Sequence, residues 1–197
     1  MKENEKVKKI LDDNNGIVTA MQLKEESVPY TVINEMIDTK ELKRVDRGIY
    51  INNDSYYEDE YFIFQKKHPN IIFSHNSSLY IFGMTERVPH QMEITVKRNY
   101  HVIPKNDEFV IFRVPDNIYD LGITTGNTAF GNKVKCYNIE RTIIDIIISN
   151  KTLDTESRNK AVRECVKSKN FDYDLMLEYA RKMKVYDKIK TIMDVVI

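Results

Sequence analysis

The sequence has few of the residues that mark disulfide-rich or metal-binding proteins. Its 197 residues include only two cysteines and four histidines. Cys136 and Cys165 stand alone, without Cys-x-x-Cys spacing, so no disulfide framework is indicated. The histidines lack the spacing of metal ligands. We therefore expect no cofactor and no bound metal, and a reducing cytoplasm is the default location.

Long apolar runs and glycine-rich loops are also missing. The longest apolar stretch, Ile143–Ile148, is interrupted by Asp145 and is far too short to span a bilayer. Met1–Lys6 is charged and leads into no apolar segment of the kind found in secretory signals. The six glycines form no phosphate-binding loop. These features predict a cytoplasmic protein without a membrane partner.

The net charge does not identify a partner either. The 30 basic residues are balanced by 30 acidic ones. A surface that binds nucleic acid must therefore come from local clusters of charge. Two segments qualify: residues 40–47 hold four basic and two acidic side chains, and residues 151–197 hold 11 basic and 8 acidic ones.

Residues 27–51 predict a helix that runs directly into a short hairpin. Pro29 suits the first turn of a helix, and apolar residues then recur at helical spacing. Two short β-type runs flank Asp46-Arg47-Gly48, where glycine can supply the positive φ of a tight turn. Shorter helices are indicated over residues 3–13 and after the capping-box residue Thr19. Three helices and a two-stranded wing are typical of a winged helix-turn-helix, with an ordinary helical cap on a larger domain as the alternative.

The outer face of this helix carries side chains that can contact DNA. Asn34 can pair with adenine, Thr31 can contact a thymine methyl group or a phosphate, and Tyr30 can donate to phosphate. Solvated surface positions are the alternative for these three residues. The basic residues on or beside the hairpin are expected to contact phosphates or the minor groove, and they are Lys40, Lys43, Arg44 and Arg47. For Arg44, a surface ion pair with Glu41 or Asp46 is the alternative.

The rest of the chain predicts a mixed second domain. A capping-box pattern over Ser55–Glu58 opens a helix that ends near residue 67, and Ser74 precedes another helix. Strands are expected at residues 71–73, 92–96, 109–114, 118–125 and 133–137, followed by helices from Asn138 and near residues 155–168, 172–183 and 185–195. The predicted class is α+β, with a DNA-binding domain over residues 1–53 and a second domain over residues 54–197, mixed to about residue 150 and helical over residues 151–197.

Three stretches of the sequence resemble a known family. They are Glu41–Tyr50 at the wing, Ile72–Met84 after it, and Tyr137–Asp145 farther along the chain. In this order they resemble the AbiE-type antitoxins, which are type IV antitoxins and transcriptional regulators of abortive-infection toxin–antitoxin operons. The resemblance covers most of the chain from residue 5 to residue 150.

This resemblance implies a winged-helix repressor that binds inverted-repeat operator DNA upstream of its own operon. It also implies a C-terminal domain that counters a nucleotidyltransferase-like toxin, without the need for a stable complex between the two proteins. A monomer in solution that binds paired repeats cooperatively would fit the family. A ligand-responsive winged-helix regulator without a toxin partner is the alternative function.

Enzyme signatures are weak, and we predict that the protein is not an enzyme. Ser74–Ser78 contains nucleophile and base types, but no third triad residue is identifiable, so a helix cap and a polar turn explain it better. Arg141 and Asp145 lie four apart on a helix and predict an intrahelical ion pair. A basic set on the C-terminal helices could form an antitoxin or nucleic-acid face, with solvated helix faces as the alternative: Lys160, Arg163, Lys167, Arg181 and Lys182.

Overall fold

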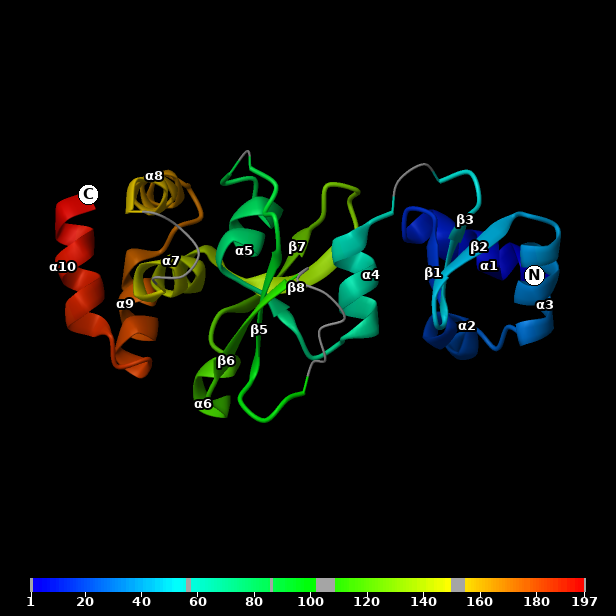
Figure 1. Ribbon diagram of the computed structural model, residues 1–197, viewed down its shortest axis with the longest axis horizontal. Helices are drawn as coiled ribbons and strands as arrows, with labels where there is room; N and C mark the ends of the chain where they lie inside the picture. Colours follow the sequence, from blue (N-terminus) through cyan, green and yellow to red (C-terminus); the bar gives the residue numbers. More distant parts are fainter. Residues whose placement is uncertain (1, 56–57, 86, 102–108, 150–154, 197) are drawn as a thin grey trace. The chain divides into compact units, whose positions relative to one another are not determined.

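The computed structural model describes residues 2–55, 58–85, 87–101, 109–149 and 155–196, which form an α+β protein (Figure 1). The predicted α+β class is therefore confirmed. The chain divides into two compact units. Unit 1 comprises residues 1–67 and 129–132, and unit 2 comprises residues 68–128 and 133–197. No helix in the described parts of the chain is long and apolar enough to cross a membrane.

Unit 1 combines short helices with an antiparallel sheet. Its elements are α1 (Glu3–Asp13), β1 (Ile17–Thr19), α2 (Ala20–Glu25), α3 (Tyr30–Asp38), β2 (Leu42–Asp46), β3 (Ile49–Asn52) and α4 (Glu60–Lys67). Strand β3 lies between β1 and β2. Apolar side chains from α1, α2, α3 and the sheet share one core, which includes Val7, Ile33 and Tyr50. The hairpin β2–β3 is thus tied through β1 to the start of α2.

Local signals account for most boundaries in unit 1. Thr19 caps α2, because its Oγ1 accepts from Gln22 N at 3.3 Å and Gln22 Oε1 accepts from Thr19 N at 3.0 Å. Gly48, with φ of +71°, closes the tight turn between β2 and β3. Pro29 is the N-cap of α3, one position before the first turn. The pattern does not predict β1, since three buried residues show no alternation.

Helix α4 begins later than the Ser55–Glu58 pattern predicts. Asp59 precedes the helix, and its Oδ1 accepts a hydrogen bond from Phe62 N at 3.1 Å. The cap therefore comes from this carboxylate, and the helix begins at Glu60. Tyr56 and Tyr57, the middle residues of the expected capping box, lie outside the described residues.

Side-chain contacts place α4 in unit 1. Asn132 Nδ2 donates to Asp59 Oδ2 at 2.9 Å, and Asn15 Nδ2 donates to Asn132 Oδ1 at 3.2 Å. At the other end of α4, Lys67 pairs with Asp46 of β2. The division between the units consequently falls after Lys67, later in the chain than the boundary expected after residue 53.

Unit 2 is built on a mixed sheet with helices. Its elements are β4 (Ile72–Phe73), α5 (His75–Ile81), β5 (Met92–Lys97), β6 (Phe109–Val114), α6 (Asp116–Tyr119), β7 (Ile123–Asn127), β8 (Lys133–Tyr137), α7 (Ile139–Ile148), α8 (Thr155–Val166), α9 (Tyr173–Lys182) and α10 (Tyr186–Val196). The described strands are ordered β6-β5-β4-β8-β7, with β5–β6 and β4–β8 parallel and the other two pairs antiparallel.

The strand expected over residues 118–125 is shorter than predicted. Pro115, with φ of −60°, is the N-cap of α6, so residues 116–119 are helical. In this region, Ile123–Asn127 forms a strand, β7, which pairs antiparallel with β8. The apolar side chains of residues 118–121 therefore belong to a short helix and its exit, which a period-two pattern cannot distinguish from a strand.

The C-terminal helices pack against α7. Figure 1 shows α8, α9 and α10 stacked around α7, beyond α5 and the sheet. Their shared core includes Ile143 of α7, Met176 of α9 and Ile189 of α10. Asn138 and Asp172 cap α7 and α9, because their side chains accept backbone hydrogen bonds at the starts of these helices.

A buried ion pair lies on α7. Arg141 Nε donates to Asp145 Oδ1 at 3.0 Å, and the Arg141 side chain is 0% exposed. Its Nη1 donates to the carbonyl oxygens of Ile118 and Leu121, at 2.6 and 3.2 Å. The guanidinium carbon lies 4.3 Å from the centre of the Tyr137 ring. The predicted pair is confirmed, and it also ties α7 to α6 and to β8.

Replacing one partner of this pair should destabilise the protein strongly. Arg141→Met leaves the Asp145 carboxylate buried without its cation, so we expect the free energy of unfolding to fall by about 3–5 kcal/mol. The matched control is Lys182→Met, which breaks the exposed Glu178–Lys182 pair of the same spacing and should cost less than about 1 kcal/mol. Urea unfolding measures both losses. Equal losses would show that burial gives the Arg141 pair no special role.

Candidate nucleic-acid interface

Helix α3 exposes the side chains that the sequence predicts for DNA contact. Ile33 and Met36 are buried in the core of unit 1, whereas Tyr30, Thr31 and Asn34 are exposed. Residues three and four apart are neighbours on a helix. The structure therefore brings these three side chains together on the outer surface of the first turns of α3.

Tyr30 is held by a contact with strand β3. The Tyr50 hydroxyl donates to the Tyr30 hydroxyl oxygen at 3.1 Å. Burial, together with this hydrogen bond, raises the pKa of Tyr50 to about 12. Tyr30 itself remains 54% exposed. Because Tyr50 pairs with Arg44 across β2 and β3, the contact fixes the start of α3 relative to the hairpin.

Two arginines present their charge at the hairpin. Arg47 lies in the turn, and within the described residues its guanidinium makes no hydrogen bond or ion pair. Arg44 is exposed on β2, and its Nε donates to the carbonyl oxygen of Asp46 at 3.1 Å. That contact holds Arg44 along the turn without cancelling its charge. Both guanidinium groups can therefore meet a phosphate.

The two lysines predicted to contact DNA, Lys40 and Lys43, differ in their exposure and in their partners. Lys40 follows α3 with φ of +61°, which is uncommon for a residue other than glycine, and its side chain is exposed. Lys43 is half-buried, with Nζ donating to the carbonyl oxygen of Ser55 at 3.3 Å and lying 3.8 Å from Glu58 Oε1. Lys43 is thus partly neutralised within unit 1, whereas Lys40 is open to solvent.

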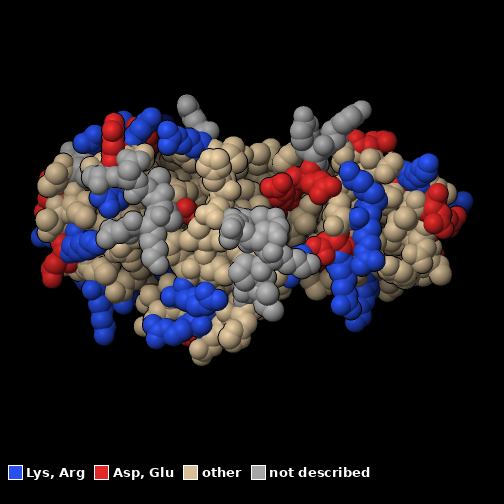
Figure 2. All heavy atoms as spheres, in the orientation of Figure 1, with Lys and Arg blue, Asp and Glu red and all other residues tan. Residues whose placement is uncertain are grey.

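Acidic side chains near the hairpin have partners of their own. Asp46 pairs with Lys67, and Glu41 pairs with Lys8 at 3.3 Å. Neither carboxylate pairs with Arg44, which was the alternative considered for this residue. Figure 2 shows basic side chains in a band on the N-terminal unit, with acidic clusters beside them. In unit 1, exposed basic side chains at or beside the hairpin include Lys40, Arg44 and Arg47.

Two of the family-like stretches meet in the core of unit 2. His75 begins α5 with φ of +50°, its Nδ1 lies 3.0 Å from Ser74 Oγ, and its ring stacks on Phe112 with 3.6 Å between centroids. Burial lowers the pKa of His75 to about 4, while Asp145 opposes this shift and Arg141 adds to it. The histidine is therefore a neutral core residue near physiological pH.

The serines around His75 are also buried, and their hydroxyl groups are hydrogen-bonded within unit 2. Ser74 is the N-cap of α5 as predicted, but its Oγ accepts from Thr95 Oγ1 at 2.9 Å instead of capping the helix. Ser78 Oγ donates to the carbonyl oxygen of Phe73 at 2.8 Å. All of these hydroxyls are buried. They join α5 to the sheet; the polar turn expected after Ser74 is instead the buried first part of helix α5.

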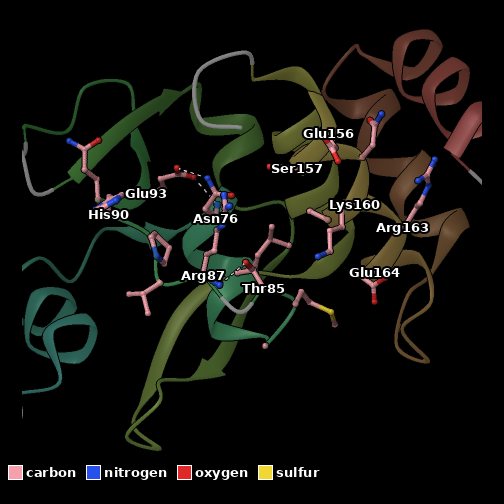
Figure 3. A pocket seen from close by; sticks show the side chains of 18 of the residues that line it. Asn76, Thr85, Arg87, His90, Glu93, Glu156, Ser157, Lys160, Arg163 and Glu164 are labelled. Atoms are coloured by element: carbon pink, nitrogen blue, oxygen red, sulfur yellow. Dashed lines mark hydrogen bonds between the residues drawn. The ribbon is translucent and has the colours of Figure 1, made fainter. Parts of the chain in front are cut away.

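A cleft in unit 2 collects some of the basic residues expected on the C-terminal helices. It has a volume of about 1540 Å³ and is lined by α5, by residues 83–85 and 87–91, and by α8 (Figure 3). Lys160 and Arg163 line it from α8, and Arg87 and His90 line it from the segment over residues 87–91. The sequence analysis did not single out Arg87 or His90, because residues in an irregular loop carry no periodic signal.

The other members of that basic set lie elsewhere. Lys167 pairs with Glu164 at 2.9 Å, and Lys182 pairs with Glu178 at 2.6 Å. The guanidinium carbon of Arg181 lies 4.6 Å from the centre of the Tyr186 ring. The structure therefore divides the predicted face, and Lys160 and Arg163 are the members that share a cleft.

The two cysteines, Cys136 and Cys165, are buried and form no disulfide. Burial raises the pKa of each thiol to about 12. Among the described residues, no three His, Cys, Asp or Glu side chains are grouped so that they could hold a metal ion.

Comparisons with known proteins bear on the fold. No protein-family model matches the chain, and no curated protein matches it either. Among solved structures, it is similar to the crystal structure of RV2827C protein from Mycobacterium tuberculosis, with a TM-score of 0.56 and 13% sequence identity. The likeness covers 95% of this chain and 77% of that one. At this identity the likeness supports the fold alone.

The low pKa of His75 makes stability depend on pH in acid. The unfolded chain binds a proton on this imidazole below about pH 6.5, whereas the folded protein does so only near pH 4. The unfolded state therefore binds more protons in this window, and stability falls as the pH drops through it, by up to about 3 kcal/mol. Asparagine tolerates a positive φ, so His75→Asn should retain the fold, lose some stability at pH 7 and show a shallower decline in acid.

Denaturant unfolding between pH 4.5 and pH 7 tests this expectation. His90→Asn, which changes an exposed histidine, is the matched control and should keep the wild-type decline. A parallel decline for His75→Asn and the wild type would contradict the role assigned to His75.

Proposed function

We propose that this protein is an AbiE-type, type IV antitoxin that represses its own operon through an N-terminal winged helix-turn-helix. One observation carries the proposal: the element order α1-β1-α2-α3-β2-β3, with β3 between β1 and β2. This arrangement exposes the outer face of α3 and pairs it with a basic hairpin. In a helix-turn-helix, the second helix lies in the major groove and its N-terminal residues contact base edges.

The side chains have complementary roles in this proposal. Asn34 and Thr31 on α3 contact base edges, and Tyr30 donates to a phosphate. Arg44 and Arg47 bind phosphates or the minor groove through the wing. These basic contacts supply affinity and a dependence on salt, whereas the α3 contacts supply specificity.

The contacts of unit 1 support preorganised binding. The hydrogen bond between Tyr50 and Tyr30 joins α3 to β3, and Ala20 N donates to the carbonyl oxygen of Gly48, which joins α2 to the hairpin turn. Helix and wing are thus held together before DNA is present. A surface that is ordered in advance loses less conformational freedom on binding.

The antitoxic function is proposed for unit 2, from the resemblance of Ile72–Met84 and Tyr137–Asp145 to the antitoxin family. These stretches supply core contacts such as the His75 stack and the Arg141–Asp145 pair. Their buried residues therefore shape unit 2, and the surface that counters a nucleotidyltransferase-like toxin must consist of exposed side chains. Action without a stable complex requires only that this surface reaches the target or the effect of the toxin.

Operator binding should respond differently to changes in α3 and in the wing. Asn34→Ala should weaken binding to the operator by about 1–3 kcal/mol and reduce discrimination between bases. Arg47→Ala should weaken binding to all sequences alike and reduce the salt slope of log K by about one unit. Fluorescence anisotropy with the DNA upstream of the protein's own operon, over a salt series, measures both.

Lys190→Ala, which changes an exposed lysine of α10, is the matched control and should bind like the wild type. If Asn34→Ala and Arg47→Ala both keep the wild-type affinity and salt slope, neither α3 nor the wing is the DNA-binding surface.

Antitoxicity should survive the loss of wing contacts. The double variant Arg44→Ala/Arg47→Ala should lose repression of its operon, because two phosphate contacts are removed. It should still restore growth when the nucleotidyltransferase-like toxin of the operon is expressed, since the proposed antitoxic surface lies in unit 2. Growth curves and a reporter fused to the operator measure the two effects in the same strain.

Expression levels of the wild type and the double variant must match for this comparison. Failure of the well-expressed wild type to restore growth would remove the antitoxin assignment. Retained operator binding would then favour the ligand-responsive regulator.

A further inference from the structure

The cleft of unit 2 contains positive charge that the protein itself does not neutralise. Arg87 and Lys160 line it from the segment over residues 87–91 and from α8, and neither side chain makes an ion pair or a hydrogen bond within the described parts of the chain. Figure 3 shows Lys160 pointing into the cleft, toward the side formed by Asn76, Thr85 and Arg87. Two cations from different elements thus border one space.

The described lining of the cleft holds three basic and three acidic side chains, so its formal charge is balanced and an anion would be favoured only locally, near cations that make no ion pair. Glu93, Glu156 and Glu164 also line it, but Glu164 pairs with Lys167 outside the lining, and Glu93 is buried. Arg163 adds a third cation to Arg87 and Lys160, although Figure 3 shows it pointing away from the centre. An anionic group would therefore find the most favourable position between Arg87 and Lys160.

Glu93 and Asn76 provide a fixed polar group at one wall. Glu93 Oε2 accepts from Asn76 N at 2.7 Å, and Glu93 Oε1 accepts from Asn76 Nδ2 at 2.7 Å. The carboxylate is therefore held in one orientation, and its remaining acceptor capacity can serve a ligand. Amino groups at the edge of a nucleobase are donors of the kind that such an acceptor binds.

Apolar side chains occupy another part of the lining. Met84, Val88 and Pro89 lie near Arg87 in the sequence, and Val88 is 66% exposed. An exposed apolar strip beside a polar group and a pair of cations matches the three parts of a nucleotide. A base would cover the strip and meet Glu93 with its edge, and a phosphate would meet the cations.

We propose that the cleft binds a nucleoside phosphate, either free or as the terminal nucleotide of a single-stranded RNA. The cleft has a volume of about 1540 Å³, whereas small-molecule sites typically have volumes of about 300–1,000 Å³. It therefore leaves room for the neighbouring nucleotides of a chain. An acidic peptide would satisfy the cations, but it would leave the fixed Glu93 carboxylate facing like charge.

This inference goes beyond the proposed function and does not depend on operator binding by unit 1. The experiment uses the full chain in the Arg44→Ala/Arg47→Ala background, so that the wing contributes little to nucleic-acid binding. Isothermal titration calorimetry with each of the four ribonucleoside triphosphates tests the free nucleotide. Anisotropy of a fluorescein-labelled, six-nucleotide single-stranded RNA tests the terminal one.

Arg87→Gln and Lys160→Gln should each weaken binding by about tenfold, because each removes one charge-assisted contact with phosphate. Lys160→Arg should retain most of the affinity. Lys190→Gln, an exposed change elsewhere in unit 2, is the control and should have no effect. Thermal unfolding of each variant shows whether the fold is retained.

Binding that depends on Arg87 and Lys160 supports the proposal. Binding of a triphosphate indicates a free nucleotide, and binding of the RNA alone indicates the terminal nucleotide of a chain. Absence of binding for both ligands at millimolar concentration overturns it. Equal weakening by Lys190→Gln overturns it as well, since the attraction would then be unspecific. Binding of a poly-glutamate peptide in place of both nucleotide ligands would show that the cleft recognises acidic protein segments instead.

Discussion

The guanidinium of Arg141 is buried inside unit 2, so its charge needs acceptors from the protein in place of water. Much of unit 2 depends on the groups that supply them. Removing a guanidinium from water costs several kcal/mol unless a carboxylate and further acceptors replace the solvent. Asp145 supplies the carboxylate, and the carbonyl oxygens of Ile118 and Leu121 accept from Nη1. The backbone after α6 must therefore pass close to α7. Gly122 makes this passage possible, because a Cβ there would lie 2.8 Å from the Cβ of Arg141.

The distance along the chain between two contacting residues decides which parts of the fold could be predicted from the sequence. The caps at Thr19, Asn138 and Asp172 join residues three apart, so they are visible in the sequence. The Arg141–Asp145 pair is visible for the same reason. In contrast, the hydrogen bond from Asn132 to Asp59 joins residues 73 apart and brings residues 129–132 into unit 1. No local pattern contains such a contact, so the limits of the two units could not be predicted.

The residues of the candidate interface also fall into two groups, those that local spacing predicts and those that depend on long-range contacts. Helical periodicity alone predicts that Thr31 and Asn34 face outward on α3, and the structure places both there. The engagement of Lys43 with Ser55 and Glu58 depends on how the chain returns after β3, and spacing does not reveal it. Arg87 is a further example. It joins Lys160 in one cleft only because a loop and a distant helix meet, which composition and periodicity cannot show.

The stretches of this chain that resemble the antitoxin family need not form its functional surface. Wing residues such as Arg44 and Arg47 are exposed, so the resemblance at Glu41–Tyr50 bears directly on a possible contact with DNA. His75 and Arg141 are buried, so the resemblance at these residues reflects packing, although Asn76 and Met84 of the stretch around His75 also line the cleft. A protein could keep the buried residues of both stretches and change the exposed residues around them. The activity of unit 2 must therefore be assigned from exposed side chains; Arg87 and Lys160 are of this kind, and neither makes an ion pair with another described residue.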